Sequence, residues 1–257
     1  MNENIFTRTL NKIEGVIRFG SLKAGEIGIQ VGFDLSSKNL TTDVMRMSSR
    51  TSDSGLVVAI DPDPTNHTKM QEIIDRKNLN VKLIRKATYS KSTNSKLILG
   101  TRASYNKLDV IPSEDSPSYT NETIEVEMCT LDSIVEELNL DYARIRHICI
   151  TNNGAEYETL LGMSTIFEKC PNLNLTIASG RPLKIGELNG RRDHEVISEF
   201  LQERGFATKL IRLNRSFWNG FVIHIFVKRK WVFSEERFGF IIAARGDRKL
   251  SLLQKLQ

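Results

Sequence analysis

Short runs rich in Val and Ile alternate along the chain with stretches in which apolar residues recur at the helical period. The runs are typical of buried strands, and the stretches between them are typical of helices that cover a sheet. Strands joined by helical crossovers pair in parallel, so this order predicts a doubly wound α/β sheet. The candidate strands are Gly28 to Val31, Leu56 to Ile60, Val81 to Arg85, Ile145 to Ile150 and Leu173 to Ala178.

Three helices are predicted with clear limits. The apolar positions of Thr65 to Lys77 and of Ala155 to Lys169 repeat at helical spacing, and Pro171 stops the second of these helices. A third helix runs from about Arg192 to Arg204, and Gly205 is its expected C-cap.

The C-terminal part of the chain predicts a closing antiparallel strand pair. Its two strands are Thr208 to Leu213 and Phe221 to Val227, and Phe238 to Ala243 is expected to add an edge strand. We therefore expect one α/β domain over residues 1–227 and a basic C-terminal extension over residues 228–257.

The region from Lys91 to Thr123 is rich in Ser, Asn and Pro, and it is predicted to be the least regular part of the chain. Two interpretations stay open, a lid over a substrate opening and a plain surface excursion.

A chain of 257 residues with 40% hydrophobic content suits a single large domain with a buried core. The longest apolar stretches are too short to span a bilayer, and the N-terminus lacks the pattern of a signal peptide. We therefore expect a cytoplasmic protein.

Cysteine and histidine add no chemistry of their own. Cys129, Cys149 and Cys170 are odd in number and lack C-x-x-C spacing, so we expect buried, unreactive thiols. The four histidines are scattered without the spacing of metal ligands, and no metal site is predicted.

The formal net charge of +5 is concentrated at one end of the chain. Residues 228–257 contain eight basic and three acidic side chains, so this segment carries the whole excess. Such a segment attracts an anionic partner, namely nucleic acid, anionic lipid or an acidic protein, or else it forms a solvated surface or an oligomer contact.

Four sequence motifs follow one another in a recognisable order. They are Leu22-Lys23-Ala24-Gly25-Glu26 with the strand up to Asp34, then Val57 to Pro64 with Asn66, then Thr130-Leu131-Asp132, then Ile148 to Met163. Together they resemble the FkbM-type methyltransferases, over roughly residues 20–215. In that family the last motif is a strand ending in I-D-V-E-G-A-E, followed by a helix that begins Y-x-x-L-x-G-M.

The resemblance implies a class I methyltransferase fold, which is Rossmann-like, and S-adenosylmethionine as the cofactor. The residues that it places around the cofactor are Gln30, Gly32, Phe33, Asp34, Ser36, Asp61, Pro62, Lys86, Ala87 and Thr151.

The loop after the first strand separates two kinds of cofactor. A dinucleotide binder needs G-x-G-x-x-G to wrap two phosphates, whereas this loop has Gly32 alone and Ser36 at the family's third small position. Nicotinamide and flavin cofactors are therefore disfavoured. Gly32 lets the backbone pass close to a ligand.

Three acidic or amide side chains have alternative roles. Asp61 stands where the family has Glu and either accepts hydrogen bonds from both ribose hydroxyls or caps the helix that starts near Pro64. Gln30 replaces the family's first-strand acid and contributes no charge. Asp34 either replaces that acid in part or is only an N-terminal helix residue.

The candidate acceptor side has lost its family carboxylates. Thr151 and Asn153 stand where the family has Asp and Glu, so Glu156 is the only acid of the family's I-D-V-E-G-A-E pattern that remains. Glu156 is either a general base or an acid that favours the start of a helix. Asn153 either orients the acceptor by hydrogen bonding or is a turn residue, while Asp132 is expected to be an N-cap.

Two functions from different classes are consistent with these motifs. The first is an S-adenosylmethionine-dependent methyltransferase acting on oxygen of a small-molecule or sugar-type acceptor. The second is a methyltransferase-like protein that has lost catalysis and serves as a binding or partner subunit. A nucleic-acid amino-methyltransferase is disfavoured, because Thr151 to Gly154 does not resemble the N-P-P-Y tetrapeptide of those enzymes.

Overall fold

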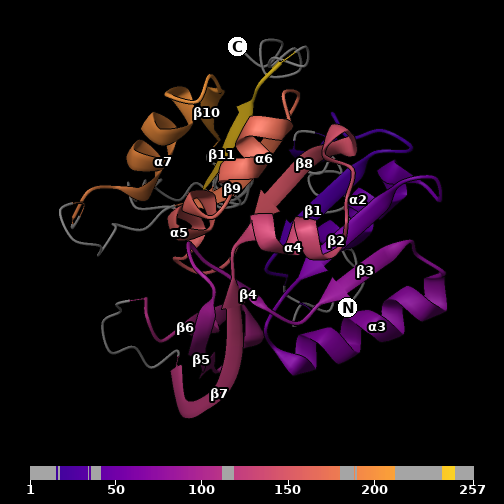
Figure 1. Cartoon of the computed structure of the whole chain (residues 1–257). Helices are drawn as coiled ribbons and strands as arrows, with labels where there is room; N and C mark the ends of the chain where they lie inside the picture. The colour runs from indigo at the N-terminus through magenta and orange to yellow at the C-terminus, as the bar shows by residue number, and fades with distance from the viewer. Residues whose placement is uncertain are drawn as a thin grey trace, which may run out of the picture.

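Two sheets make up the fold in the computed structural model (Figure 1), which describes residues 16, 18–33, 35, 42–111, 119–179, 188, 190–211 and 239–246. The larger sheet has seven strands in the order β10-β11-β9-β8-β1-β2-β3. Their bounds are β1 Ile27–Val31, β2 Leu56–Ile60, β3 Val81–Ile84, β8 Ile145–Ile150, β9 Asn174–Ser179, β10 Ala207–Ile211 and β11 Gly239–Ala244.

The order of the strands confirms the predicted fold class. β3, β2, β1, β8 and β9 pair in parallel, and β11 pairs antiparallel with both β9 and β10. A parallel sheet closed by an antiparallel strand pair is the class I methyltransferase arrangement. Strand order reverses between β1 and β8, so loops from neighbouring strands open a crevice there.

The prediction of an edge strand at Phe238 to Ala243 was wrong in position. β11 lies inside the sheet between β9 and β10, and five of its six residues are buried, namely Gly239 and Ile241 to Ala244. Its nearly continuous apolar sequence is typical of a strand covered on both faces rather than of an edge. Part of segment 228–257 therefore belongs to the sheet, whereas the predicted strand at 221–227 lies outside the described residues.

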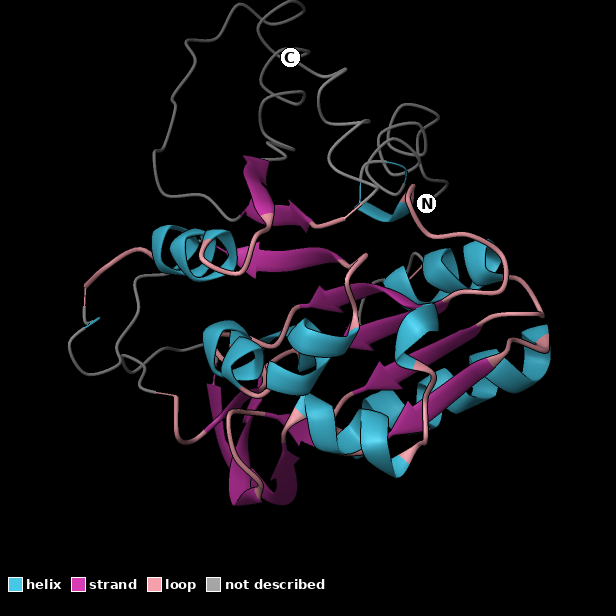
Figure 2. Cartoon of the chain, turned by 45° about the horizontal axis from the view of Figure 1, so that its top comes forward, coloured by secondary structure: helices cyan, strands magenta, loops and turns pink. Residues whose placement is uncertain are grey.

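Helices lie on both faces of the seven-stranded sheet (Figure 2). Alternate residues of one strand serve the two faces: Val58 and Ile60 join a core with the α4 to α7 side, while Val57 and Ala59 join a core with α2 and α3. The bounds are α2 Asp43–Thr51, α3 Pro64–Lys77, α4 Leu131–Glu137, α5 Glu156–Leu161, α6 Ser164–Lys169 and α7 Asp193–Gln202, with a 3-10 turn η2 at Tyr142–Arg144.

The helix predicted from Ala155 to Lys169 is two helices, α5 and α6. The Asp132 carboxylate accepts hydrogen bonds from the backbone N–H groups of Thr165 (2.7 Å) and Ile166 (2.9 Å), which starts α6 as a separate helix. Asp132 was predicted to cap its own helix, and this was wrong, because Thr130 caps α4 by accepting from the N–H of Ser133.

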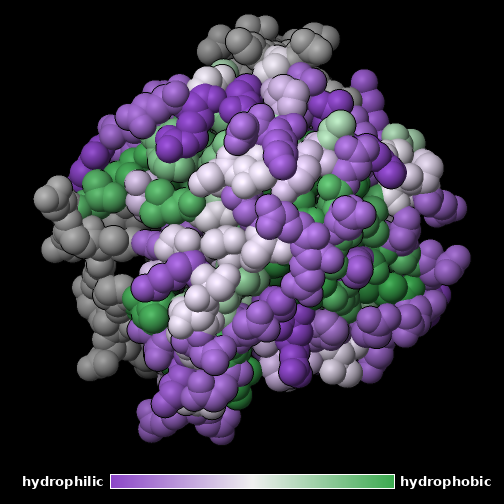
Figure 3. Space-filling model, in the orientation of Figure 1, coloured by the Kyte–Doolittle hydropathy of each residue, from purple (hydrophilic) through white to green (hydrophobic). Residues whose placement is uncertain are grey.

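The region from Lys91 to Thr123 was predicted to be irregular, but three of its segments, Thr93–Gly100, Lys107–Leu108 and the start of the strand Tyr119–Cys129, belong to a second sheet. Its four strands have the order β4-β7-β5-β6 and enclose a small core that includes Leu97, Val126 and Met128. The outward-facing side chains are mostly polar, as Figure 3 shows, so their composition imitates that of a loop. The bounds are β4 Ala87–Thr88, β5 Thr93–Gly100, β6 Lys107–Leu108 and β7 Tyr119–Cys129, with a 3-10 turn η1 at Ala103–Tyr105.

The three cysteines are free and buried, as predicted, and burial raises the pKa of each thiol, that of Cys149 to about 11. In the part of the chain that the structure describes, no helix is long and apolar enough to cross a membrane.

Candidate cofactor site

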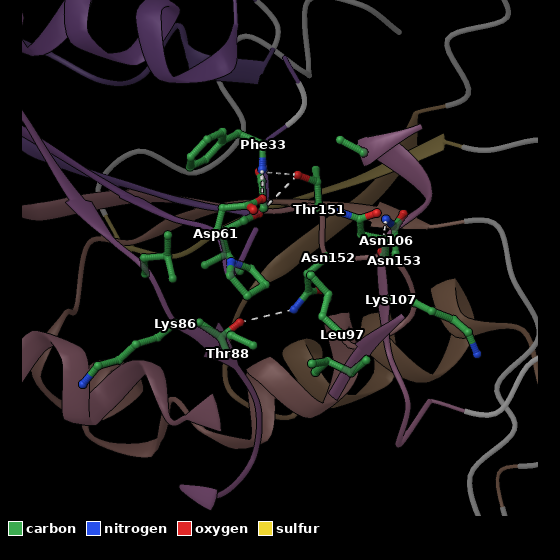
Figure 4. Close-up of a pocket in the computed structure, with 17 residues that line it drawn as sticks. Phe33, Asp61, Lys86, Thr88, Leu97, Asn106, Lys107, Thr151, Asn152 and Asn153 are labelled. Atoms are coloured by element: carbon green, nitrogen blue, oxygen red, sulfur yellow. Dashed lines mark hydrogen bonds between the residues drawn. The ribbon is translucent and has the colours of Figure 1, made fainter. Parts of the chain in front are cut away.

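A cavity of about 230 Å³ opens at the carboxyl ends of β1, β2 and β8 (Figure 4). The small sheet forms its opposite wall. Eight of the predicted site residues line it, namely Gly32, Phe33, Asp61, Pro62, Lys86, Ala87, Thr151 and Asn153. Gln30 and Glu156 lie behind the wall, and Asp34 and Ser36 lie outside the described residues.

Gly32 allows the ends of β1 and β8 to approach closely. Its φ is +70°, in the left-handed region, and a Cβ there would overlap the carbonyl oxygen of Thr151. The N–H of Gly32 donates to Ile60 O (2.8 Å) and the N–H of Thr151 donates to Val31 O (2.9 Å). A glycine is therefore required for the narrow turn that bounds the cavity.

Asp61 is buried at the end of β2, and its carboxylate organises the loop after β1. It accepts hydrogen bonds from the backbone N–H groups of Phe33 (3.1 Å) and Asp63 (2.9 Å) and from the side-chain amide of Asn66 (3.4 Å). Burial raises the pKa of the Asp61 carboxyl to about 7, and the hydrogen bonds from Asp63 and Phe33 offset part of that rise. The cavity is therefore lined by a carboxyl group whose pKa is close to neutral pH.

The helix cap proposed as the alternative role of Asp61 belongs to Asp63. Its side chain accepts from the N–H of Thr65 (2.7 Å) and is the N-cap of α3. Asp61 is thus relieved of the capping role, which leaves its oxygens for the loop and for a ligand.

Gln30 and Thr151 form a neutral bridge where acidic residues would stand in the family. The side-chain amide of Gln30 donates to Gly32 O (2.6 Å) and to the Thr151 hydroxyl (3.1 Å), and this hydroxyl donates to Gly32 O (2.9 Å). Gln30 is 1% exposed, and its Oε1 has no hydrogen-bond partner among the residues that the structure describes. These two side chains are therefore committed to holding the strand ends together.

Glu156 is buried and turned toward its own loop. Its two carboxylate oxygens accept from the backbone N–H groups of Asn152 (3.1 Å) and Gly154 (2.7 Å). The carboxylate does not line the cavity. This geometry favours the structural alternative for Glu156, which shapes the loop between β8 and α5.

Asn153 lies in the cavity wall with φ of +56°, a conformation that Asn tolerates better than most side chains. Its amide donates to the carbonyl oxygen of Asn106 (2.7 Å) in the small sheet. The neighbouring Asn152 donates to the hydroxyls of Thr159 (2.8 Å) and Thr88 (3.2 Å), so the wall on this side is polar and uncharged.

Lys86 and Ala87 contribute backbone atoms and the aliphatic part of the lysine side chain to the cavity wall, but no charge. The ammonium group of Lys86 pairs with Glu137 (2.8 Å) and Glu127 (3.0 Å), which raise its pKa, and it points away from the cavity (Figure 4). The backbone around Ala87 therefore lines the cavity without a charge beside it.

Apart from Ala87, the wall from the small sheet was not found from the sequence. Its other residues are Thr88, Leu97, Ala103, Asn106, Lys107 and Leu108. The apolar run Leu97-Ile98-Leu99 is a strand signal, but the Ser and Asn content of the surrounding region obscured it. Among the described residues, no group of three or more His, Cys, Asp or Glu is placed to hold a metal ion.

Comparison with known proteins identifies one family and several solved structures of similar fold. The model of the FkbM methyltransferase domain matches residues 26–207. No curated protein sequence matches the chain. A methyltransferase FkbM from Methylobacillus flagellatus is 12% identical with a TM-score of 0.48, over 85% of this chain and 43% of that one.

Two further solved structures have similar sequence identities and TM-scores. An O-methyltransferase from Bacillus cereus in complex with SAH is 12% identical with a TM-score of 0.45, over 95% of this chain and 83% of that one. A SAM-dependent methyltransferase from Aquifex aeolicus is 12% identical with a TM-score of 0.42, over 91% of this chain and 88% of that one.

Proposed function

The chain belongs to the FkbM methyltransferase domain family, and on that premise we propose that it binds S-adenosylmethionine and methylates a hydroxyl oxygen of a small-molecule or sugar-type acceptor. The observation that carries the proposal is the position of Asp61. Its buried carboxylate lies at the end of β2, in the wall of a cavity that also contains the Gly32 turn.

The residues of the cavity suit an adenosine. Asp61 is the acceptor for the two ribose hydroxyls, and the apolar side chains of Pro62, Leu97 and Leu108 offer surfaces to a flat base. Backbone groups around Ala87 suit the edge of that base. Gly32 gives the ligand access to the turn after β1 without interference from a side chain.

The cofactor would supply a methyl group on a positively charged sulfur. The chain's own contribution is to hold the acceptor oxygen in line with that carbon and to exclude water, which is the main source of rate in such a displacement. Asn153 and Asn152 orient an acceptor hydroxyl from the loop after β8. We propose no metal ion in this reaction.

A second candidate function is a cofactor-binding partner subunit without transfer activity. It is favoured by the fact that Gln30, Thr151 and Glu156 are all committed to backbone or loop hydrogen bonds. Transfer of a labelled methyl group to a panel of hydroxylated acceptors separates the two functions, since the partner subunit would bind the cofactor and yield no methylated product.

Calorimetric titration should show binding of both S-adenosylmethionine and S-adenosylhomocysteine with dissociation constants in the micromolar range. The physical reason is that the adenosine contacts are shared by the two ligands. Absence of binding by either one at millimolar concentration would refute both candidate functions.

Cofactor affinity should depend on pH through Asp61. The ionised carboxylate accepts both ribose hydroxyl hydrogens, whereas the protonated form loses acceptor capacity. With its pKa raised to about 7, the affinity should rise about tenfold between about pH 6 and about pH 8 and level off above.

Asp61→Asn is the matched variant for this profile, because it keeps the shape of the side chain and removes the titration. Its affinity should be lower than that of the wild type at about pH 8 and nearly flat over the same range. An equally steep profile in Asp61→Asn would show that another group is responsible.

A further inference from the structure

Asn106 joins three segments that bound the cavity. It lies between η1 and β6 in the small sheet, and it lines the cavity itself. Figure 4 shows it beside Asn153, on the wall opposite Asp61. Each of its polar groups beyond its own N–H is engaged with a different segment.

The first contact is to the loop between β2 and α3. The side-chain amide of Asn106 donates to the Asp63 carboxylate at 2.7 Å, and Asp63 is 6% exposed. Asp63 follows Asp61 by two residues and donates its N–H to the Asp61 carboxylate. The position of Asn106 is therefore linked directly to the residue proposed to hold the ribose.

The second contact is to the loop between β8 and α5. The carbonyl oxygen of Asn106 accepts from the side-chain amide of Asn153 at 2.7 Å. Asn153 stands where the family has Glu, and a glutamate at this position could not donate this hydrogen bond. The amide that replaces the family's acid is thus used to bring the small sheet to the loop.

The third contact lies within the small sheet. The side-chain oxygen of Asn106 accepts from the N–H of Gly100 at 2.9 Å, which closes the turn between β5 and β6. The turn carries Ala103, and the strands on either side carry Leu97 and Leu108, all of which line the cavity. One side chain thereby fixes the wall and attaches it to both loops.

We propose that Asn106 is a positioning residue for the cofactor site. It holds the small sheet against the β2–α3 and β8–α5 loops, so that the wall of the cavity opposite Asp61 is fixed in place. The proposal rests on the proposed function, since the ligand is S-adenosylmethionine or its demethylated product. Asn106 makes no covalent or proton-transfer step.

The test is a carboxylate exchange across the contact between Asn106 and Asp63. Asn106→Asp is isosteric, keeps the acceptor for Gly100, and places a carboxylate against the carboxylate of Asp63. In the double variant with Asp63→Asn, the new amide at position 63 donates to the new carboxylate at position 106, so the hydrogen bond is restored in the opposite direction. Asn remains a good N-cap for α3. Asn94→Asp, on the exposed side of β5, is the control for the added charge.

At about pH 8, Asn106→Asp should raise the dissociation constant of S-adenosylhomocysteine at least about tenfold, and Asn94→Asp should change it less than about twofold. The double variant Asn106→Asp/Asp63→Asn should return to within about threefold of the wild type. Amide hydrogen exchange in the ligand-free protein should be faster over residues 93–108 in Asn106→Asp and should slow again in the double variant.

Unchanged affinity for S-adenosylhomocysteine in Asn106→Asp would overturn the proposal. The proposal would also fail if the double variant regained the wild-type rate of amide exchange over residues 93–108 but not the wild-type affinity. A wild-type protein that binds neither S-adenosylmethionine nor S-adenosylhomocysteine would instead overturn the proposed function. In that case, an unchanged rate of amide hydrogen exchange in Asn106→Asp would also refute the proposal that Asn106 holds the small sheet against the two loops.

Discussion

Gly32→Ala should abolish measurable cofactor binding and lower the free energy of unfolding by about 3 kcal/mol or more. The left-handed φ of +70° accounts for about 1 kcal/mol of this loss. The rest comes from overlap of the new Cβ with the carbonyl oxygen of Thr151, which is backbone and cannot rotate away. The ends of β1 and β8 must therefore separate, and the turn that bounds the cavity is lost.

Gly25→Ala is the matched control, because Gly25 also has a left-handed φ, of +81°, but lies at the opposite end of β1. Among the described residues, a Cβ there would meet only the Ser54 hydroxyl at 3.8 Å, which is ordinary contact. We expect a loss of about 1 kcal/mol in urea unfolding and normal binding of S-adenosylhomocysteine by calorimetry. Equal effects of the two substitutions would show that backbone conformation alone, and not the approach to Thr151, is responsible.

The larger sheet could be predicted because its strands are covered on both faces. Leu56–Ile60 and Ile145–Ile150 have the predicted bounds. Leu56–Ile60 is a continuous apolar run between Gly55 and Asp61, which leaves little freedom in its limits. The break between α5 and α6 could not be predicted in the same way. It depends on Asp132, which is more than thirty residues away in sequence and supplies its carboxylate to α6.

The small sheet and β11 were misjudged for opposite reasons. One face of β5 and β7 is solvated, so Ser, Asn and Thr of a true strand looked like those of a loop. β11 was recognised as a strand, but its place between β9 and β10 depends on pairing that a sequence pattern does not specify.

The positions of candidate site residues were easiest to predict at the ends of strands. Gly32, Asp61 and Pro62 lie in the cavity wall, because the carboxyl ends of adjacent parallel strands meet at one edge of the sheet. Alternative roles could be separated only with coordinates. The choice between ligand contact and cap for Asp61 depends on Asp63 having taken the cap, and the choice for Glu156 depends on the direction of its carboxylate.

The neutral residues that replace family acids are integrated into the fold, and this changes what restoring an acid should do. If Thr151 and Asn153 only stand in for lost acids, Thr151→Asp together with Asn153→Glu should strengthen cofactor binding or activity. Its hydroxyl, however, donates toward the carbonyl oxygens of Gly32 (2.9 Å) and Val31 (3.2 Å). A carboxylate has no hydrogen to give to them and would face both at close range.

Thr151→Asp should therefore lower the free energy of unfolding by about 3 kcal/mol at neutral pH and weaken cofactor binding, because it loses a donor and adds a poorly compensated charge. The Gln30 amide at 3.1 Å can offset part of this cost. Thr151→Ser keeps the hydroxyl and should stay within about 1 kcal/mol of the wild type. The measurements are urea unfolding and calorimetric titration with S-adenosylmethionine. A stable Thr151→Asp protein with raised affinity would show instead that the strand ends still accommodate the family's acid, and that Gln30 and Thr151 are replacements which the surrounding fold has not come to depend on.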